Sequence, residues 1–276
     1  MREREKVVFI GGAGHSGSTL LGLMLGAHPE VFYAGEARKS LFLGDESKPL
    51  KKRVCKLCGP SCPIWGELGR APGEDLYATL VRRTGRRIVV DSTKNLSWTG
   101  EQLETLSRRD VDRHLIFLAR DGRAVVCSRL RKYPERSARE HAEDWAAQIR
   151  ATEALAARFP GTVLRVRYEA LASAPEPTMR EVATFLGVDY APAMSAPWTT
   201  EQHPLGGNNG TQFLMRGNEG GVVALTDKTR DHYGAHPRGI VLDLRWKREL
   251  SDDARAAFDE VAGDLNRAYA WGEEST

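Results

Sequence analysis

Residues Val7 to Leu21, with the sequence VVFIGGAGHSGSTLL, join an apolar strand, a glycine-rich turn and the start of a helix. The turn and the first helical residues supply glycines and hydroxyls: Gly11, Gly12, Gly14, Ser16, Gly17, Ser18 and Thr19. The free N–H groups of a helix's first turn and the positive end of its dipole attract anions, and glycines let the backbone approach them closely. This segment therefore predicts a phosphate-binding loop, and with it a nucleotide-type ligand.

The loop departs from the P-loop of Mg-dependent nucleotide hydrolases at one position. The spacing from Gly12 to Gly17 matches the first part of G-x-x-x-x-G-K-[ST], but Ser18 stands in place of the lysine. Because that lysine reaches the β- and γ-phosphates, its absence indicates a ligand whose transferred group is held in another way. For this segment alone, a tight strand-to-helix connection without a ligand is the structural alternative.

A second segment, His114 to Lys132, has the sequence HLIFLARDGRAVVCSRLRK. Its apolar strand, Leu115 to Leu118, is followed by Arg120 and then by a helical stretch that carries Ser128, Arg129 and Lys132. In open parallel sheets, ligands bind at the carboxyl ends of the strands, and a guanidinium placed there suits a phosphate. The segment predicts a second phosphate site; a solvated basic helix is the alternative.

The two segments occur in this order, and each opens a helix after a strand. In this the chain resembles the PAPS-dependent sulfotransferases, in the branch that contains tyrosylprotein, carbohydrate and many bacterial enzymes. Their donor is 3′-phosphoadenosine 5′-phosphosulfate (PAPS), and PAP is the nucleotide product. The resemblance implies a P-loop-like three-layer α/β fold in which helices flank a central parallel sheet. It also implies these donor-binding residues: Gly14, His15, Ser16, Gly17, Ser18, Thr19, Arg120, Ser128, Lys132 and Tyr168.

Three residues inherit catalytic roles from the resemblance. Glu36 ends GAHPEVFYAGE, where relatives place a catalytic base, and Lys94 lies in DSTKN, where relatives place a catalytic lysine. His15 stands where many relatives have Arg or Lys, which replaces a permanent cation by one that depends on pH. GGNNG and the later DLRW, Asp243 to Trp246, resemble the family's C-terminal segment.

Sulfuryl transfer needs these residue types. Moving a charged SO3 group in line from a phosphate oxygen to a hydroxyl is mostly positioning and charge stabilisation, as in phosphoryl transfer. Glu36 is the candidate base that accepts the hydroxyl proton. Lys94, His15 and the loop N–H groups can stabilise the negative charge of the transferred group and the leaving nucleotide, so we expect that no metal is required. The acceptor can be a carbohydrate, a tyrosine or a natural-product hydroxyl. The alternatives are a P-loop small-molecule kinase using ATP and a nucleotide-binding protein without catalysis.

Composition is that of a globular enzyme, with 41% hydrophobic and 28% charged residues. With 40 basic and 37 acidic residues the net charge is +3, too balanced to argue for a nucleic-acid or membrane partner. The basic runs 48–56 and 82–87 are expected to be solvated.

The first residues, MREREKVVFI, contain no signal-peptide pattern, and no apolar run reaches membrane-spanning length, so we expect a cytoplasmic protein. The sequence does not indicate an oligomeric state.

Three cysteines lie close together in KKRVCKLCGPSCPIW, at Cys55, Cys58 and Cys62. A structural zinc site needs four ligands, and no fourth ligand is apparent near them in the sequence. Metal binding, a disulfide such as Cys55 to Cys62, and unpaired thiols in a packed loop all stay open, and we assign no metal ligand. Cys127 is expected to face the core of its helix.

The order of elements predicts one α/β domain over residues 1–276. Strands are expected from Val7, at Ile88, at Leu115 and at Val163 to Val166, with helices following each. Two stretches interrupt this alternation: a cysteine-containing insertion at about 35–73 and a loop at about 191–238. We expect them to wall the acceptor pocket and to form a lid over the donor. The histidines of the second stretch, His203, His232 and His236, are expected to be exposed rather than catalytic.

Overall fold

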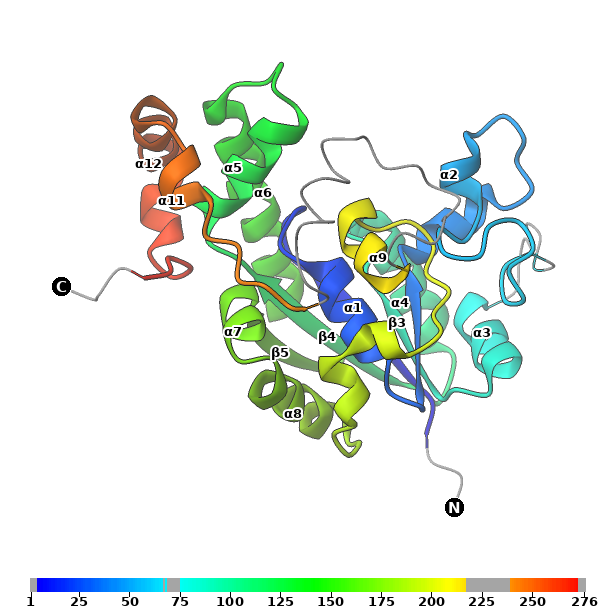
Figure 1. Cartoon of the computed structure of the whole chain (residues 1–276). Coiled ribbons are helices and arrows are strands. Elements are labelled where there is room, and N and C mark those ends of the chain that lie inside the picture. Colours follow the sequence, from blue (N-terminus) through cyan, green and yellow to red (C-terminus); the bar gives the residue numbers. More distant parts are fainter. Residues whose placement is uncertain (1–3, 67, 69–74, 217–238, 273–276) are drawn as a thin grey trace.

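The computed structural model describes residues 4–66, 68, 75–216 and 239–272. Its centre is a parallel sheet (Figure 1), in which the strands follow the order β2-β3-β1-β4-β5. The strands are β1 (Lys6–Gly11), β2 (Val31–Gly35), β3 (Ile88–Asp91), β4 (Asp112–Ala119) and β5 (Thr162–Arg167). The predicted α/β fold with a central parallel sheet flanked by helices is confirmed.

The helices alternate with the strands along the chain. They are α1 (Ser18–Gly26), α2 (Leu50–Arg53), α3 (Leu76–Thr84), α4 (Leu96–Ser107), α5 (Gly122–Lys132), α6 (Ala138–Ala157), α7 (Tyr168–Ser173), α8 (Pro175–Leu186), α9 (Asn209–Arg216), α11 (Trp246–Glu249) and α12 (Asp252–Asn266). Short 3-10 helices cover Ala37–Phe42, Pro192–Ser195 and Pro197–Thr199. The four predicted strands are present, and the sequence analysis missed β2, whose five residues are all buried.

Local sequence explains the helix boundaries. The hydroxyl of Ser137 accepts a hydrogen bond from the N–H of Glu140, and the Glu140 side chain returns one, which is a capping box at the start of α6. Ser251 caps α12 in the same way through its hydroxyl. At the end of α8, Gly187 takes φ +65°, a left-handed conformation that glycine adopts without strain.

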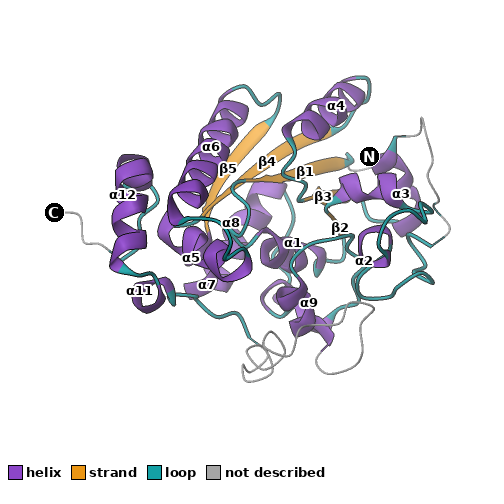
Figure 2. Cartoon of the chain, turned by 90° about the horizontal axis from the view of Figure 1, so that it is seen from above, coloured by secondary structure: helices purple, strands orange, loops and turns teal. Residues whose placement is uncertain are grey.

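Both faces of the sheet are buried, as expected for parallel strands. On one face, Val8, Ile10 and their neighbours pack with α1, α7 and α8. On the other face, Val7 and Phe9 pack with α3, α4 and the cysteine-containing segment. Phe117 of β4 faces a third cluster formed by α5, α6, α11 and α12, which buries Cys127 as predicted. Figure 2 shows helices on both sides of the strands.

This arrangement places a crevice beside β1. From β1 the chain passes through α1 on one face, and from β4 it passes through α5 on the opposite face. The connections after two neighbouring strands therefore diverge at their carboxyl ends, where open α/β sheets bind ligands. The glycine-rich loop that follows β1 and Arg120, which follows β4, both lie there.

The two long connections meet beside this edge of the sheet. Leu205 forms isolated bridges with Gly35 and with Cys55, so the segment before α9 lies against the end of β2 and the cysteine-containing segment. The predicted lid at 191–238 falls partly outside the described residues, as do His232 and His236. Among the helices that the structure describes, none is both long enough and apolar enough to cross a membrane.

Candidate active site

A cavity of about 560 Å³ opens at the carboxyl ends of β1, β3 and β4. Of the residues singled out from the sequence, the lining includes Gly14, His15, Gly17, Ser18, Thr19, Glu36, Lys94, Arg120, Ser128, Lys132 and Tyr168. The predicted donor-binding and catalytic residues thus converge on one cavity, with the exception of Ser16, a loop residue that is fully buried.

Two glycines of the first loop are required by close contacts. Gly12 has φ +126°, and a Cβ there would lie 2.2 Å from the carbonyl oxygen of Leu118. Gly17 has φ +90°, and a Cβ there would lie 2.6 Å from the Tyr168 ring. Gly17 is also the N-cap of α1 and makes no side-chain cap, so the first N–H groups of the helix are left for another acceptor.

His15 lies at the tip of this loop and has φ +71°, the one left-handed non-glycine among the described residues. Its Nδ1 lies 2.9 Å from the Ser128 hydroxyl on α5. Burial, together with the positive charges of Lys132, Arg129, Arg120 and Lys94, lowers the pKa of His15 to about 3. The imidazole is therefore neutral at pH 7, and the expectation that it supplies a pH-dependent cation does not hold for the ligand-free protein.

Two residues hold this loop in place, Arg129, which the sequence analysis placed in the second phosphate segment, and Gln148, which it missed. The Gln148 side-chain oxygen accepts a hydrogen bond of 2.8 Å from the N–H of Gly14. Arg129 donates to the same oxygen at 2.7 Å and to the Gly14 carbonyl at 3.3 Å. Arg129 and Gln148 come from α5 and α6, so the second phosphate segment also positions the first.

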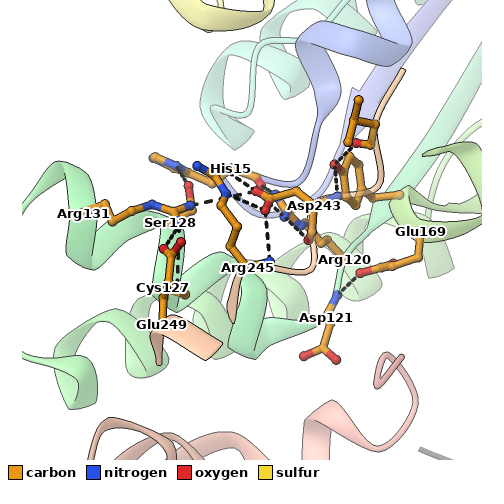
Figure 3. Close-up of polar contacts among 12 residues, drawn as sticks. His15, Arg120, Asp121, Cys127, Ser128, Arg131, Glu169, Asp243, Arg245 and Glu249 are labelled. Atoms are coloured by element: carbon orange, nitrogen blue, oxygen red, sulfur yellow. Dashed lines mark hydrogen bonds and ion pairs between the residues drawn. The ribbon is translucent and has the colours of Figure 1, made fainter. Parts of the chain in front are cut away.

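Arg120 occupies the centre of a charged cluster (Figure 3). It donates to the carbonyl oxygens of His15 at 3.0 Å and Asp243 at 3.3 Å, and its guanidinium lies 4.2 Å from the centre of the Tyr168 ring. The Asp243 carboxylate accepts from Arg120 at 3.3 Å and from Arg245 at 2.7 and 2.8 Å. Burial alone would raise the pKa of Asp243, but the hydrogen bond from Arg245 and the charge of Arg120 hold it well below its usual range.

The opposite wall of the cavity carries Lys94 and Glu36. Lys94 donates a short hydrogen bond to the Ser18 hydroxyl, and burial lowers the pKa of its ammonium. Glu36 accepts the Gly207 N–H at 3.1 Å and pairs with Lys39 at 2.6 Å. Burial raises the pKa of Glu36, but the charges of Lys39 and Lys94 outweigh this and leave the pKa below its ordinary value. Glu36 is therefore ionised at neutral pH, the state that a general base requires.

Two buried polar atoms at the site lack a partner among the described residues. These are the Ser16 hydroxyl oxygen and Nε of Arg120. Buried polar groups are normally hydrogen-bonded, so unpaired donors beside a cavity suit a ligand with acceptor oxygens. The donor set, with its backbone N–H groups, hydroxyls, Lys94 and Arg120, fits an anion with more than one phosphate-type group.

Comparison with known proteins agrees with this geometry. A family model described as "Sulfotransferase family" matches residues 74–192, which include Lys94, Arg120, Ser128 and Tyr168. A protein of Caenorhabditis briggsae named "Putative protein-tyrosine sulfotransferase" is 26% identical over 196 residues, 69% of this chain and 68% of the relative. These matches confirm that the chain resembles the sulfotransferase family.

Solved structures share the fold of this chain over nearly its full length. The sulfotransferase domain of the curacin biosynthetic pathway matches with a TM-score of 0.61 and 17% identity, covering 97% of this chain and 99% of that domain. The domain of the Synechococcus PCC 7002 olefin synthase gives a TM-score of 0.54 and 20% identity, with 99% and 98% covered. Mouse SULT7A1, complexed with PAP, gives 0.51 and 16%, with 97% and 89% covered.

The candidate site also contains residues from late in the chain to which the sequence analysis assigned no role. Gly207, Asn208 and Thr211 form part of the cavity wall, and Asn208 donates to the Thr19 hydroxyl at 2.9 Å. Asp243 and Arg245 complete the charged cluster. The resemblance of DLRW to the family's C-terminal segment pointed to this part of the chain. The sequence alone does not show that Asp243 pairs with Arg120.

Two expectations about single residues are wrong. His203 is not an exposed loop histidine, because its side chain is 13% exposed and its Nδ1 lies 3.0 Å from Cys58 Sγ and 3.6 Å from Cys62 Sγ. The three cysteines therefore do have a fourth candidate ligand, about 140 residues away in the chain. Lys56 is buried rather than solvated, and donates to the Gly207 carbonyl at 2.7 Å.

Proposed function

We propose that this sulfotransferase transfers a sulfuryl group from PAPS to an acceptor hydroxyl. The observation that carries the proposal is the convergence of the α1 N-terminus, Lys94 and the Arg120–Ser128 pair on one cavity. Two anion sites on the two sides of one crevice suit a nucleotide that carries a phosphate at each end of its ribose. The PAP bound to the mouse relative supports the same donor class.

In this proposal each phosphate has its own set of donors. The 5′-phosphosulfate lies on the glycine-rich loop, where the N–H groups of α1, the Ser18 and Thr19 hydroxyls and the Lys94 ammonium can donate to it. The 3′-phosphate lies by Arg120 and Ser128, with Lys132 on the same helix as Ser128. Tyr168, already packed on Gly17 and stacked on Arg120, contacts the nucleotide between them.

The transfer step breaks the S–O bond to the 5′-phosphate and forms an S–O bond to the acceptor. Glu36 accepts the proton of the acceptor hydroxyl as it attacks. Lys94 is placed to stabilise the negative charge that develops on the bridging oxygen of the leaving PAP. His15 is neutral in the free protein, so we assign it hydrogen bonding to the phosphosulfate rather than a fixed charge. No metal takes part in these steps.

The acceptor class is a hydroxyl compound that enters beside Glu36. A tyrosine hydroxyl is supported by the name of the C. briggsae relative, and a carbohydrate or natural-product hydroxyl fits the same base. Gly207 donates to the Glu36 carboxylate, and Gly207, Asn208 and Thr211 line the same cavity. We therefore expect this wall to select among acceptors.

Thermal shift with nucleotides tests the donor assignment. PAP is expected to stabilise the protein far more than 5′-AMP or ATP, without any effect of Mg²⁺, because only PAP fills both anion sites. Equal shifts with ATP and PAP, or a shift that needs Mg²⁺, would favour a kinase instead. Labelled PAPS incubated with peptide, carbohydrate and phenolic acceptor pools then tests transfer; PAP binding without any transfer would favour a non-catalytic nucleotide-binding protein.

A further inference from the structure

A cluster of three thiols and one imidazole lies outside the cavity, between the two long connections. It consists of Cys55, Cys58, Cys62 and His203, whose ligand atoms all lie within 4.8 Å of one another. Cys55 and Cys62 are buried, while Cys58 and His203 are half-buried. The cluster joins residues that are far apart in sequence, and the sulfuryl-transfer mechanism uses none of them.

The distances suit a tetrahedral metal ion. Zn–S bonds of about 2.3 Å and Zn–N bonds of about 2.0 Å in a tetrahedron place neighbouring ligand atoms roughly 3.5–3.8 Å apart. Nδ1 of His203 lies 3.0 Å from Cys58 Sγ and 3.6 Å from Cys62 Sγ. Movements of about 1 Å or less would bring the four ligand atoms to the separations that tetrahedral zinc requires.

The backbone around the first two cysteines turns both thiols to the same side. The Gly59 N–H donates to the Cys55 carbonyl at 2.9 Å, and Gly59 has φ +83°. The Cys62 N–H then donates to the Gly59 carbonyl at 3.3 Å. A two-residue spacing followed by this reversal is a compact way to present a pair of sulfur ligands to one ion.

The histidine is held with Nδ1 toward the sulfurs. The indole N–H of Trp65 donates to the His203 carbonyl at 2.5 Å, which fixes the backbone next to the ligand. On the far side of the ring, Nε2 lies 3.6 Å from the Glu201 carboxylate. A ligating histidine normally directs its other ring nitrogen to a carboxylate, carbonyl or water, so the ring has the surroundings of a ligand.

From this geometry we propose that Cys55, Cys58, Cys62 and His203 bind one structural zinc ion. Three sulfurs and one nitrogen in a tetrahedron select zinc among the common divalent ions, and four protein ligands close the coordination shell, as in structural sites. On binding, the three thiols release their protons to solvent and coordinate as thiolates. The ion takes no part in sulfuryl transfer.

The zinc site holds in place the segment from His203 to Gly207, which forms part of the cavity wall. Two residues after His203, the Leu205 N–H donates to the Ala34 carbonyl at 3.0 Å, and the Leu205 carbonyl accepts the Glu36 N–H at 2.7 Å. Two residues later, the Gly207 N–H contacts the Glu36 carboxylate. A metal ion at His203 therefore ties the cysteine-containing segment to the strand that ends beside Glu36. The consequence for turnover rests on the proposed function, whereas zinc binding itself does not.

Metal analysis of the purified full-length chain tests the site. We expect one zinc per chain, and a Co²⁺-substituted protein with the intense thiolate-to-cobalt charge-transfer absorption of a sulfur-rich tetrahedral site. Cys58→Ser and His203→Ala should lose the metal. Cys127→Ser, which changes a cysteine buried elsewhere, and His28→Asn, which changes a histidine outside the cluster, should keep it.

A second measurement uses the unaltered chain, so it tests the site even if the variants fail to fold. Alkylation of Cys58, the half-buried thiol, is expected to slow at least about tenfold when zinc is bound and to recover after chelation. Absence of zinc after reconstitution, alkylation rates that chelation does not change, or a Cys55–Cys62 disulfide in the native protein would each overturn the proposal. PAP binding serves as an independent readout, because the donor site contains none of the four ligands; if PAP fails to bind while zinc is present, the proposed function fails alone.

Discussion

Nδ1 of His15 and the hydroxyl of Ser128 lie 2.9 Å apart, so one hydrogen bond connects the loop after β1 to the helix after β4. Arg120 reinforces the same connection by donating to the His15 carbonyl at 3.0 Å. These hydrogen bonds link the two proposed anion sites, and substitutions at one site are expected to affect the other.

Replacing Arg120 tests recognition of the 3′-phosphate. Arg120→Lys keeps a charge but loses the planar pair of donors, and it should reduce the preference for PAP over 5′-AMP by about 10- to 100-fold, the range for a charge-assisted hydrogen bond. Titration calorimetry with both nucleotides measures this ratio. Arg108→Lys, on the exposed surface, is the control, and an unchanged ratio in Arg120→Lys would place the 3′-phosphate elsewhere.

Glu36→Gln is expected to lower kcat by about 10²- to 10⁴-fold while PAP affinity stays near its original value, because the amide cannot accept the acceptor's proton. The amide oxygen can still accept the Gly207 N–H, so the wall should stay in place. Steady-state kinetics and PAP titration measure the two effects separately. Lys39→Met breaks the ion pair without removing the base and should cost much less. Full activity in Glu36→Gln would exclude Glu36 as the base.

The buried His15 predicts loss of stability in mild acid. Its pKa is about 3 in the folded protein and about 6.5 in the unfolded chain, so the unfolded state binds the extra proton between these values. The free energy of unfolding therefore falls as the pH drops below about 6.5, by at most about 1.4 kcal/mol per pH unit from this group. Denaturant titrations of the ligand-free protein at several pH values should show a shallower loss in His15→Asn, since asparagine tolerates the left-handed backbone.

Gly17→Ala should weaken both stability and PAP binding. The residue would adopt φ +90° with its Cβ 2.6 Å from the Tyr168 ring, so the loop or the ring must move. The left-handed backbone costs about 1–2 kcal/mol before that contact is counted. Gly100→Ala is the matched control, because it lies in α4 with nothing within 4 Å of the new Cβ. There alanine is expected to stabilise the helix by up to about 1 kcal/mol. Thermal melts with and without PAP compare the two variants.

In the ligand-free protein the Asp243 carboxylate pairs with Arg120, a cation that we assign to the 3′-phosphate, and with Arg245. Asp243→Asn should lower the melting temperature of the free protein, because the charges of Arg120 and Arg245 lose their partner; each 1 kcal/mol corresponds to about 2–4 °C in a chain of this size. The same change should increase the stabilisation by PAP, since the phosphate no longer competes with a carboxylate. A smaller PAP shift in the variant would mean that Asp243 supports the nucleotide instead.

Local sequence determined the elements and the positions of the first donor groups. The glycines of the first loop, the strand before Arg120 and the hydroxyl cap Ser251 each act through neighbours within a few residues, so their patterns are visible along the chain. The predicted cavity residues converge because parallel strands align their carboxyl ends, a rule that requires only the order of elements.

Only the tertiary structure decided the contacts between distant segments and the charge states that they produce. His203 meets the cysteines, Gly207 meets Glu36, and Asp243 meets Arg120, each across more than 100 residues of chain. No spacing rule encodes such pairs, because they depend on how loops fold back over the sheet. The neutral His15 has the same origin. Its pKa is set by burial and by cations from four separate positions, and these come together only when the chain folds.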